Sequence, residues 1–306
     1  TVIANEVRPD AENYKPENFS LLSLGKESGA SRVSRFFRYQ LLLWKHLWRA
    51  DGVFFHMCPE YVLGAHFIPY IFRKKTLLWY VHREVNWRLR LAEKLADKVF
   101  TASKESCRLQ SKKVVVVGHG FDTDLFKSPP LRTGGMHLIT AGRISPVKDV
   151  RTLILGFLEL KKRFPEVTLS IVGEPITEPD RVEIEELRHI SSDARFLGGV
   201  SHEELPRLFA AATVFVHASR TGSMDKAVLE ALAAGLPVFS SSEAFSEDVP
   251  GVRTFRQGDP KDLAESIERA FASGGIVVGE AGRVFVREKH SLSRLVQRIL
   301  SFYAER

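Results

Sequence analysis

Short apolar runs with the character of β-strands alternate with helical patterns along nearly all of this chain. That alternation predicts α/β layers in which helices cover sheets of parallel strands. It is interrupted at residues 128–135, where paired prolines and paired glycines stand in a polar stretch typical of a linker. A length of 306 residues also favours about two domains. We therefore predict domains at residues 1–128 and 136–306, joined by a linker at residues 129–135.

The expected elements follow from the hydrophobic periodicity of each half. Strands are expected at residues 1–7, 19–24, 52–57, 76–81, 98–102 and 113–117, and then at 136–140, 168–172, 194–197, 213–217, 237–240 and 252–255. Helices are expected at residues 32–49, 84–96, 147–164, 181–191, 202–211, 226–234 and 260–273, with a final amphipathic helix over residues 291–303.

The first expected strand ends in Arg8-Pro9-Asp10, with no glycine turn and no amphipathic helix behind it. A doubly wound domain normally opens with a strand, a glycine-rich turn and a helix. Residues 1–7 therefore fit a second strand better than a first one. This interpretation predicts that the N-terminal domain lacks its first strand–helix unit, roughly 30 residues or more. The alternative is a variant domain that never had this unit.

The charge of the chain indicates an anionic partner, because the net charge is +7 and the pI is near 9.4. A nucleotide, a phospholipid surface or nucleic acid would each fit, but no nucleic-acid-binding motif accompanies the charge, so nucleic acid is not expected. Cys58 and Cys107 are too few for a disulfide framework and lack metal-ligand companions, which fits a reduced compartment. With no membrane-spanning run and no signal peptide, we expect a cytoplasmic protein.

Basic and aromatic side chains interleave in the helix expected over residues 32–49. This combination suits an anionic membrane surface or a lipid-linked acceptor, and it predicts peripheral contact at the inner membrane face. The alternative is a core helix with a solvated basic face. The residues concerned are Arg32, Arg35, Arg38, Lys45 and Arg49, with Phe36, Phe37, Tyr39, Trp44 and Trp48.

Residues 141–149 join an expected strand to an expected helix through a glycine turn. Gly142 precedes Arg143, and Lys148 follows five residues after Arg143, where the helix is predicted to start. A helix N-terminus attracts anions because its free N–H groups and its dipole point at them. Arg143 and Lys148 therefore predict a diphosphate site. The alternative is a solvated turn with basic surface residues.

A second candidate segment, residues 219–238, runs from a strand through small residues into a helix that begins near Asp225. Thr221, Gly222 and Ser223 can turn backbone N–H groups toward a ligand. Glu230 stands in an otherwise almost wholly apolar helix. Because a lone buried carboxylate is costly, Glu230 is expected to be paired or bound to a ligand. The alternative is a residue at the helix edge that reaches solvent.

The order and spacing of these segments resemble the family-4 glycosyltransferases of the GT-B fold. The resemblance covers nearly all of residues 114–300, and in the first half it is thinner. It implies two Rossmann-like domains that face each other across a cleft, with the final helix packing back toward the first domain. The residues that carry it are Arg143 and Lys148, Ile171-Val172-Gly173-Glu174, Phe196-Leu197-Gly198-Gly199-Val200, the stretch at 228–238, His82, and the turn at 118–126.

The resemblance implies a role for each matched residue. Arg143 and Lys148, on the turn at Gly142, would hold the donor diphosphate and neutralise the negative charge of the leaving group. This electrostatic stabilisation can take the place of a metal ion. Glu230 would bind the ribose hydroxyls, and Gly173 would allow close approach of the nucleotide.

Three further roles come from the same resemblance. Phe196, Leu197 and Val200 would bracket the base, and the backbone groups of Leu197 and Val200 would read its edge. His82, from the opposite domain, would contact the transferred sugar and help to align the acceptor.

One position departs from the family pattern. The family usually places a glutamate eight residues before the ribose-binding one, to hold sugar hydroxyls, and this chain has Gly222 there. Asp225, or the backbone N–H groups of Gly222, Ser223 and Met224, would have to take over that role.

The resemblance thus implies a retaining hexosyltransferase that uses a nucleoside-diphosphate sugar as donor and needs no metal ion or other cofactor. A glycan or a lipid-linked saccharide is expected as the acceptor. The alternatives are a non-catalytic or weakly active nucleotide-sugar-binding protein and another nucleotide-sugar enzyme of the same fold.

Overall fold

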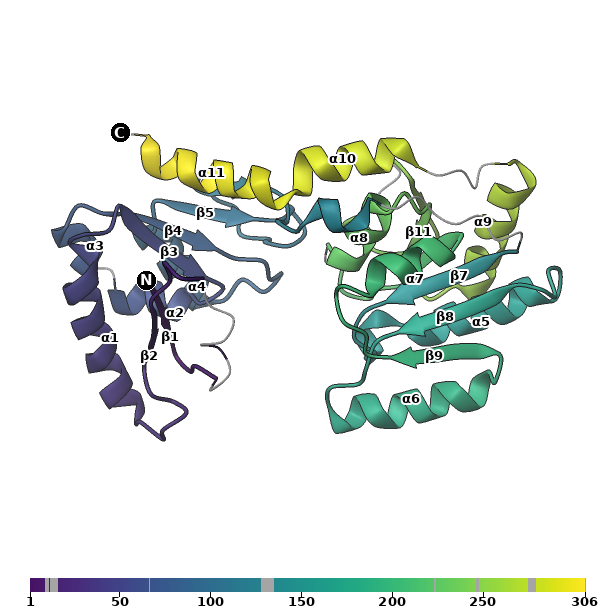
Figure 1. Ribbon diagram of the computed structural model, residues 1–306, viewed down its shortest axis with the longest axis horizontal. Helices are drawn as coiled ribbons and strands as arrows, with labels where there is room; N and C mark the ends of the chain where they lie inside the picture. The colour runs from purple at the N-terminus through teal and green to yellow at the C-terminus, as the bar shows by residue number, and fades with distance from the viewer. Residues whose placement is uncertain are drawn as a thin grey trace. The chain divides into compact units, whose positions relative to one another are not determined.

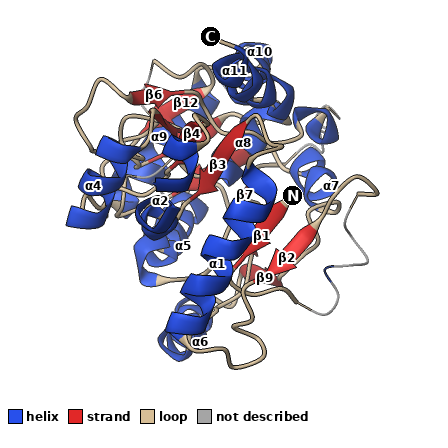
Figure 2. Cartoon of the chain, turned by 90° about the vertical axis from the view of Figure 1, so that its left-hand side faces the viewer, coloured by secondary structure: helices blue, strands red, loops and turns tan. Residues whose placement is uncertain are grey.

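The computed structural model describes residues 1–8, 11, 16–65, 67–127, 135–222, 224–245, 248–274 and 279–305. The chain forms two compact units (Figure 1). The first comprises Thr1–Thr101, Cys107–Val116 and Leu300–Arg306, and the second comprises Ala102–Ser106 and Val117–Ile299. Both units alternate strands with helices, as the sequence predicts (Figure 2).

The first unit is built on a parallel sheet whose strands follow one another in chain order. These strands are β3 (Gly52–His56), β4 (Lys75–Trp79), β5 (Lys98–Thr101) and β6 (Val114–Val116). A separate parallel pair consists of β1 (Val2–Ala4) and β2 (Leu21–Ser23). The helices are α1 (Arg32–Leu47), α2 (Pro59–Ala65), α3 (Phe67–Ile71) and α4 (Trp87–Leu95). The short helices α2 and α3 were not predicted from the sequence.

Helix α1 has one buried face and one exposed face. Its N-cap is Ser31, whose side chain accepts a hydrogen bond from the Ser34 N–H at 3.2 Å. Tyr39, Leu43 and Leu47 recur at intervals of four residues and lie in the core. The remaining aromatic side chains of the helix stay largely exposed. Within the described ranges, no helix is both long and apolar enough to cross a bilayer.

The second unit contains a parallel sheet in the order β12-β11-β10-β7-β8-β9. Its strands are β7 (His137–Ala141), β8 (Thr168–Val172), β9 (Ala194–Gly198), β10 (Val214–His217), β11 (Val238–Ser240) and β12 (Val252–Thr254). The helices are α5 (Val150–Lys161), α6 (Glu178–Ile190), α7 (Leu205–Ala211), α8 (Lys226–Ala233), α9 (Pro260–Ala272), α10 (Glu280–His290) and α11 (Leu292–Ala304). Helix α10 was not predicted.

Successive side chains of the central strands point to opposite faces of this sheet, and each face carries its own hydrophobic core. Leu138 of β7 belongs to one core and the adjacent Ile139 to the other. Helices α5, α6 and α9 contribute side chains to the first core, and α7, α8 and α10 contribute to the second. Burial on both faces explains why the middle of these strands is apolar, with Leu138 and Ile139 in β7 and residues 214–216 in β10.

The units divide at Val116 and Val117, earlier than the predicted domain boundary at residue 128. The reason is that Phe121 and Phe126, the latter at the end of the short 3-10 helix η2 (Thr123–Phe126), are buried in the second core. The predicted linker, residues 129–135, lies outside the described residues except for Gly135.

Helix α11 contributes residues to both units. Its residues up to Ile299 belong to the second unit, and those from Leu300 onward belong to the first. In the first unit, the Lys75 Nζ donates to the Phe302 carbonyl at 2.8 Å, and the Tyr303 hydroxyl donates to the Val53 carbonyl at 2.7 Å. The end of the helix is therefore held to the sheet of that unit by two hydrogen bonds, one donated by a lysine amine of β4 and one donated by the Tyr303 hydroxyl to a backbone carbonyl of β3.

Two glycines shape the carboxyl ends of β7 and β8. Gly142 (φ +144°) and Gly173 (φ +140°) both adopt backbone conformations that other residues rarely take. The Gly142 N–H donates to the Val172 carbonyl at 3.0 Å. A Cβ on Gly173 would lie 1.9 Å from the Gly142 carbonyl oxygen, whereas a Cβ on Gly142 would meet no atom within 4 Å.

We expect Gly173→Ala to destabilise the protein more than Gly142→Ala. The two positions have nearly the same φ, so the strain of the positive φ is matched between the variants. Gly173→Ala adds a clash with backbone, which should cost about 1–3 kcal/mol beyond the cost of Gly142→Ala. Urea unfolding of both variants measures the difference. Equal free energies of unfolding would show that the two strand ends can separate freely.

Two histidines join the segment after β6 to the end of α10. The His119 N–H donates to Nδ1 of His290 at 3.1 Å, and Nε2 of His119 lies 3.0 Å from the Met224 carbonyl oxygen. Burial lowers the pKa of each histidine to about 4. Both rings are therefore neutral in the folded protein at neutral pH.

Acidification should destabilise the fold through this pair. A histidine with an unfolded pKa near 6.5 and a folded pKa near 4 stabilises the fold above pH 6.5, and this contribution is lost as the pH falls toward 4. The variant His290→Asn keeps an acceptor at the place of Nδ1 but does not titrate. We expect its melting temperature to fall less between pH 7 and pH 4 than that of the parent, by differential scanning calorimetry. The exposed His189→Asn is the matched control, and an identical fall for His290→Asn and the parent would contradict the account.

Candidate functional site

The order of strands in the second unit reverses between β7 and β10. The chain continues from β7 to β8 and β9 on one side, and β10, β11 and β12 lie on the other side. In open α/β sheets, ligands bind beyond the carboxyl ends of the strands at such a reversal point. The turn after β7 and the loop after β10 both start at this edge, and they contain most of the predicted site residues.

The turn after β7 differs from the predicted start of a helix. Pro146–Lys148 form a short 3-10 turn, and Asp149 then takes a left-handed conformation (φ +43°) before α5 begins at Val150. The predicted continuous helix from residue 147 is therefore wrong, because Asp149 breaks the helical path. Arg143 is exposed and Lys148 is partly buried. Both cations lie on the turn itself rather than in the first turn of α5.

The loop after β10 is fastened to this turn. The Arg220 N–H donates to the Val147 carbonyl at 2.9 Å, and Nη2 of Arg220 donates to Oδ1 of Asp149 at 3.0 Å. Asp149 is only 2% exposed, whereas the Arg220 side chain is more than half exposed, so the pair joins a buried carboxylate to a guanidinium at the surface. Further along the loop, Gly222 is buried and has φ +62°. Two segments more than 70 residues apart in the sequence therefore form one site.

Asp225 is the carboxylate at the centre of this junction. Its Oδ1 accepts a hydrogen bond from Nζ of Lys148 at 2.5 Å, and its Oδ2 lies 2.6 Å from Nε2 of His217. Burial opposes ionisation, but His217 and Lys148 together hold the pKa of Asp225 at about 2. Asp225 is therefore an anion whose two oxygens both have partners. That arrangement does not favour its predicted substitution for a sugar-binding glutamate.

Glu230 lies in α8 and is buried, at 6% exposure. Its Oε1 lies 3.1 Å from Nε2 of His202, so the carboxylate is paired as its burial requires. The His202 side chain is about half exposed, and the sequence did not single it out. Its position directly after the Phe196–Val200 segment is the signal that would have found it.

The predicted base-binding segment spans the end of β9. Leu197 is exposed, and Phe196 is partly buried with the Arg188 guanidinium 5.6 Å from the centre of its ring. The Gly199 N–H donates to Oε1 of Glu174 at 3.2 Å. The side chain of Val200 packs against the core that contains α8. Gly173 donates its N–H to the Gly198 carbonyl at 2.8 Å, so its close approach is to neighbouring backbone.

The remaining predicted site residues are placed as follows. Met224 is partly buried and its carbonyl contacts His119, and Ser223 lies outside the described residues. His82 follows β4 in the first unit, where it is exposed and its Nδ1 accepts a hydrogen bond from the Glu84 N–H at 3.2 Å. Its role toward a sugar stays a prediction.

Glu243 is a candidate that the sequence analysis missed. It follows β11, at the same edge of the sheet, and its carboxylate lies over Gly222. A Cβ on Gly222 would lie 2.9 Å from Oε2 of Glu243. A carboxylate from one loop thus fills the place that a side chain at 222 would take. Its position just after a predicted strand was the available signal.

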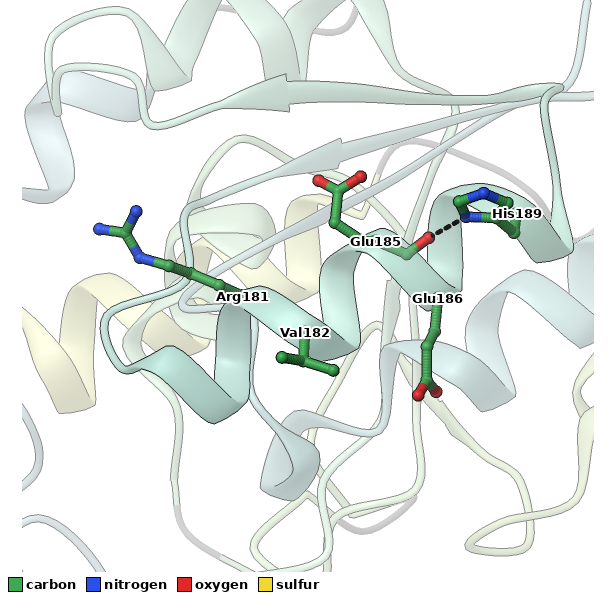
Figure 3. Close-up of a pocket in the computed structure, with 5 residues that line it drawn as sticks. All are labelled: Arg181, Val182, Glu185, Glu186 and His189. Carbon is green, nitrogen blue, oxygen red and sulfur yellow. Dashed lines mark hydrogen bonds between the residues drawn. The ribbon is translucent and has the colours of Figure 1, made fainter.

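A hollow of about 610 Å³ lies elsewhere, along the outer side of α6 (Figure 3). It is lined by five residues of that one helix: Arg181, Val182, Glu185, Glu186 and His189. Their polar side chains are already engaged. Arg181 pairs with Glu178 at 3.3 Å, Glu185 with Arg188 at 3.2 Å and Glu186 with Arg151 at 2.8 Å, and His189 Nδ1 lies 2.6 Å from the Glu185 carbonyl oxygen. It contains none of the site residues above. Among the described residues, no cluster of three or more His, Cys, Asp or Glu is placed to hold a metal ion.

Comparison with known proteins shows which proteins this chain is similar to. Residues 135–273 match the family model described as glycosyl transferases group 1. A glycogen synthase of Mycobacterium tuberculosis is 27% identical over 190 residues, which are 60% of this chain and 46% of that protein. A lipopolysaccharide 1,2-N-acetylglucosaminetransferase of Salmonella typhimurium is 25% identical over 214 residues, which are 62% of this chain and 56% of that protein. The chain thus spans about half the length of these curated relatives.

Solved structures show the same architecture over nearly the whole chain. HepE of Anabaena, in complex with UDP, superposes with a TM-score of 0.74 at 17% identity and covers 93% of this chain and 85% of its own. The lipopolysaccharide outer core galactosyltransferase WaaB superposes with a TM-score of 0.67 at 15% identity and covers 94% of this chain and 85% of its own. The predicted resemblance is confirmed: the chain has the GT-B fold, and its residues 135–273 match the family model of the glycosyl transferases group 1.

Proposed function

We propose that this protein is a retaining glycosyltransferase that moves a hexose from a nucleoside-diphosphate sugar to a hydroxyl acceptor without a metal ion. The observation that carries the proposal is the turn with Arg143 and Lys148, which lies at the reversal point of the sheet and is fastened to the loop after β10. The curated relatives include enzymes named for sugar transfer, and HepE binds UDP.

The two cations would act on the leaving group. As the bond between the anomeric carbon and the diphosphate oxygen breaks, negative charge develops on the diphosphate. Arg143 and Lys148 stabilise that charge electrostatically, so that no metal ion is needed for this step. The acceptor hydroxyl attacks from the face that the diphosphate leaves, its oxygen bonds to the anomeric carbon, and its proton passes to the departing phosphate. Attack from that face retains the anomeric configuration.

The surrounding groups would orient the donor. The buried Glu230 carboxylate, held by His202, is suited to accept hydrogen bonds from the ribose hydroxyls. The Phe196–Val200 segment would bracket the base. Glu243, whose carboxylate lies over Gly222 at the position where the family places its sugar-binding glutamate, would accept hydrogen bonds from the transferred sugar. His82 would help to align the acceptor.

Loss of either cation should weaken binding of a nucleoside diphosphate. A charge-assisted hydrogen bond contributes about 1.5–3 kcal/mol, so Arg143→Ala and Lys148→Ala should each reduce affinity roughly 10- to 100-fold. Calorimetry with a panel of nucleoside diphosphates measures this. The matched control is Arg151→Ala, a nearby cation of α5 whose guanidinium pairs with Glu186.

The same experiments separate the alternatives. Binding that is weakened by both substitutions, together with transfer to an acceptor, supports the enzyme. Binding without transfer or donor hydrolysis would instead identify a nucleotide-sugar-binding protein. If no nucleoside diphosphate binds, or if neither substitution changes the affinity, the proposed diphosphate site is wrong.

We also propose that the exposed face of α1 contacts an anionic membrane, which would bring a lipid-linked acceptor to the protein. Phe37, Leu41 and Trp44 of α1 are each more than half exposed, and basic residues flank them. Trp44 also packs against Phe72, which follows α3, at 5.1 Å between ring centres. Aromatic and basic side chains on one exposed face favour the boundary of an anionic bilayer.

Vesicle binding tests the membrane proposal. The protein should cosediment with vesicles containing phosphatidylglycerol, bind less as salt is raised, and bind little to pure phosphatidylcholine. The double variant Phe37→Glu/Trp44→Glu should lose most of this binding. Val182→Glu places a charge on an exposed apolar residue of α6 and should change nothing. Equal binding of all three proteins would overturn the proposal.

A further inference from the structure

A chain of hydrogen bonds connects the interior of the sheet to Lys148. Oγ of Ser240 lies 2.9 Å from Nδ1 of His217, and Nε2 of His217 lies 2.6 Å from Oδ2 of Asp225. Oδ1 of the same carboxylate accepts from Nζ of Lys148 at 2.5 Å. Ser240 and His217 are the last residues of β11 and β10. Asp225 directly precedes α8, and Lys148 lies on the turn after β7.

The chain is most buried at its inner end. Ser240 is fully buried and the His217 side chain is 5% exposed, whereas Asp225 and Lys148 are 18% and 23% exposed. The network therefore starts in the buried interior of the sheet and ends at the partly exposed ammonium of Lys148. The His217 ring is further fixed by the ring of Phe245, at 6.0 Å between centres.

The chemistry of the partners determines where the protons lie. The ionised carboxylate of Asp225 only accepts hydrogen bonds, so Nε2 of His217 must carry a proton. Oγ of Ser240 accepts the Ser242 N–H at 3.2 Å and lies 2.9 Å from Nδ1 of His217, so both ring nitrogens of His217 have a partner. Each bond thus has one donor and one acceptor, and the carboxylate cannot rotate without breaking two of them.

We propose that His217 and Asp225 are positioning residues that hold the Lys148 ammonium at the diphosphate site. This inference rests on the proposed function. An ammonium has three N–H donors, and Asp225 engages one of them, so the others can reach phosphoryl oxygens while the first fixes the direction of the side chain. His217 acts through Asp225, because its ring keeps the carboxylate turned toward Lys148. Neither residue needs to touch the donor.

The proposal also explains why a carboxylate stands beside a cation that should bind an anion. A lysine side chain is flexible and carries substantial rotamer entropy, which would have to be lost when the ligand binds. Pairing with a buried, anchored carboxylate removes most of that freedom in advance. The pair makes Lys148 a preorganised donor instead of a mobile surface charge.

The test is a double-mutant cycle read by the affinity for UDP, the nucleotide bound in HepE. His217→Leu removes the hydrogen bond to Asp225, whereas His217→Gln can replace the Nε2 donor with an amide N–H. With Lys148 present, we expect His217→Leu to weaken UDP binding about tenfold and His217→Gln to restore most of it. In the Lys148→Ala background, His217→Leu should have almost no further effect, because the residue it positions is gone.

A matched control separates positioning from general stability. His137 also bonds a serine of the neighbouring strand, with Nε2 at 2.8 Å from Oγ of Ser170, but it lies at the amino end of β7, away from the site. His137→Leu should leave the UDP affinity unchanged. Melting temperatures of all variants show which of them are folded under the conditions of the titration.

The outcomes distinguish the two proposals. If UDP and the other nucleoside diphosphates do not bind the unsubstituted protein, the proposed function fails. If one of them binds and Arg143→Ala weakens it, but folded His217→Leu and Asp225→Asn bind as tightly as the parent, only the positioning role is wrong. An equal effect of His217→Leu with and without Lys148 would likewise overturn it.

Discussion

The attachment of the loop after β10 to the turn after β7 is the constraint on which the rest of the site depends. These two segments leave neighbouring strands at the point where the strand order reverses. The backbone bond from Arg220 to Val147, the Arg220–Asp149 ion pair and the Lys148–Asp225 ion pair all cross the same junction. Without it, Lys148 would be a solvated surface charge, which is the alternative that the sequence alone leaves open for the basic residues of the turn.

Burial makes this junction specific. Asp149 is almost fully enclosed, and Asp225 is mostly so, and a buried carboxylate without a partner is costly. Each therefore selects the one arrangement of loops that supplies its cation. The same logic applies to Glu230, whose partner His202 comes from the segment before α7. Charged pairs in this unit thus determine how loops lie over a sheet whose own strands are held by apolar packing.

The sequence predicted the strands of both units well, because strands buried on both faces, such as β7 and β10, leave short runs of mostly apolar residues in the sequence. It missed α2, α3 and α10, and the first two are too short to show a helical period. The predicted boundary between the two domains lies later than the division between the units. The sequence around Phe121 and Phe126 has the pattern of a loop, and it does not show that both side chains are buried in the core of the second unit. The pairing of His217, His202 and Glu243 was not found because their partners lie eight or more residues away along the chain, so only the place of each residue beside a predicted strand or candidate segment pointed to it.

The central claim is that the turn after β7 binds the diphosphate of a nucleotide. A crystal structure of the protein with UDP tests it most directly. The account predicts diphosphate oxygens within hydrogen-bond distance of Arg143 and Lys148, with Lys148 still paired to Asp225 and the ribose beside Glu230. UDP bound elsewhere, for example along α6, or a diphosphate that touches neither cation, would contradict it.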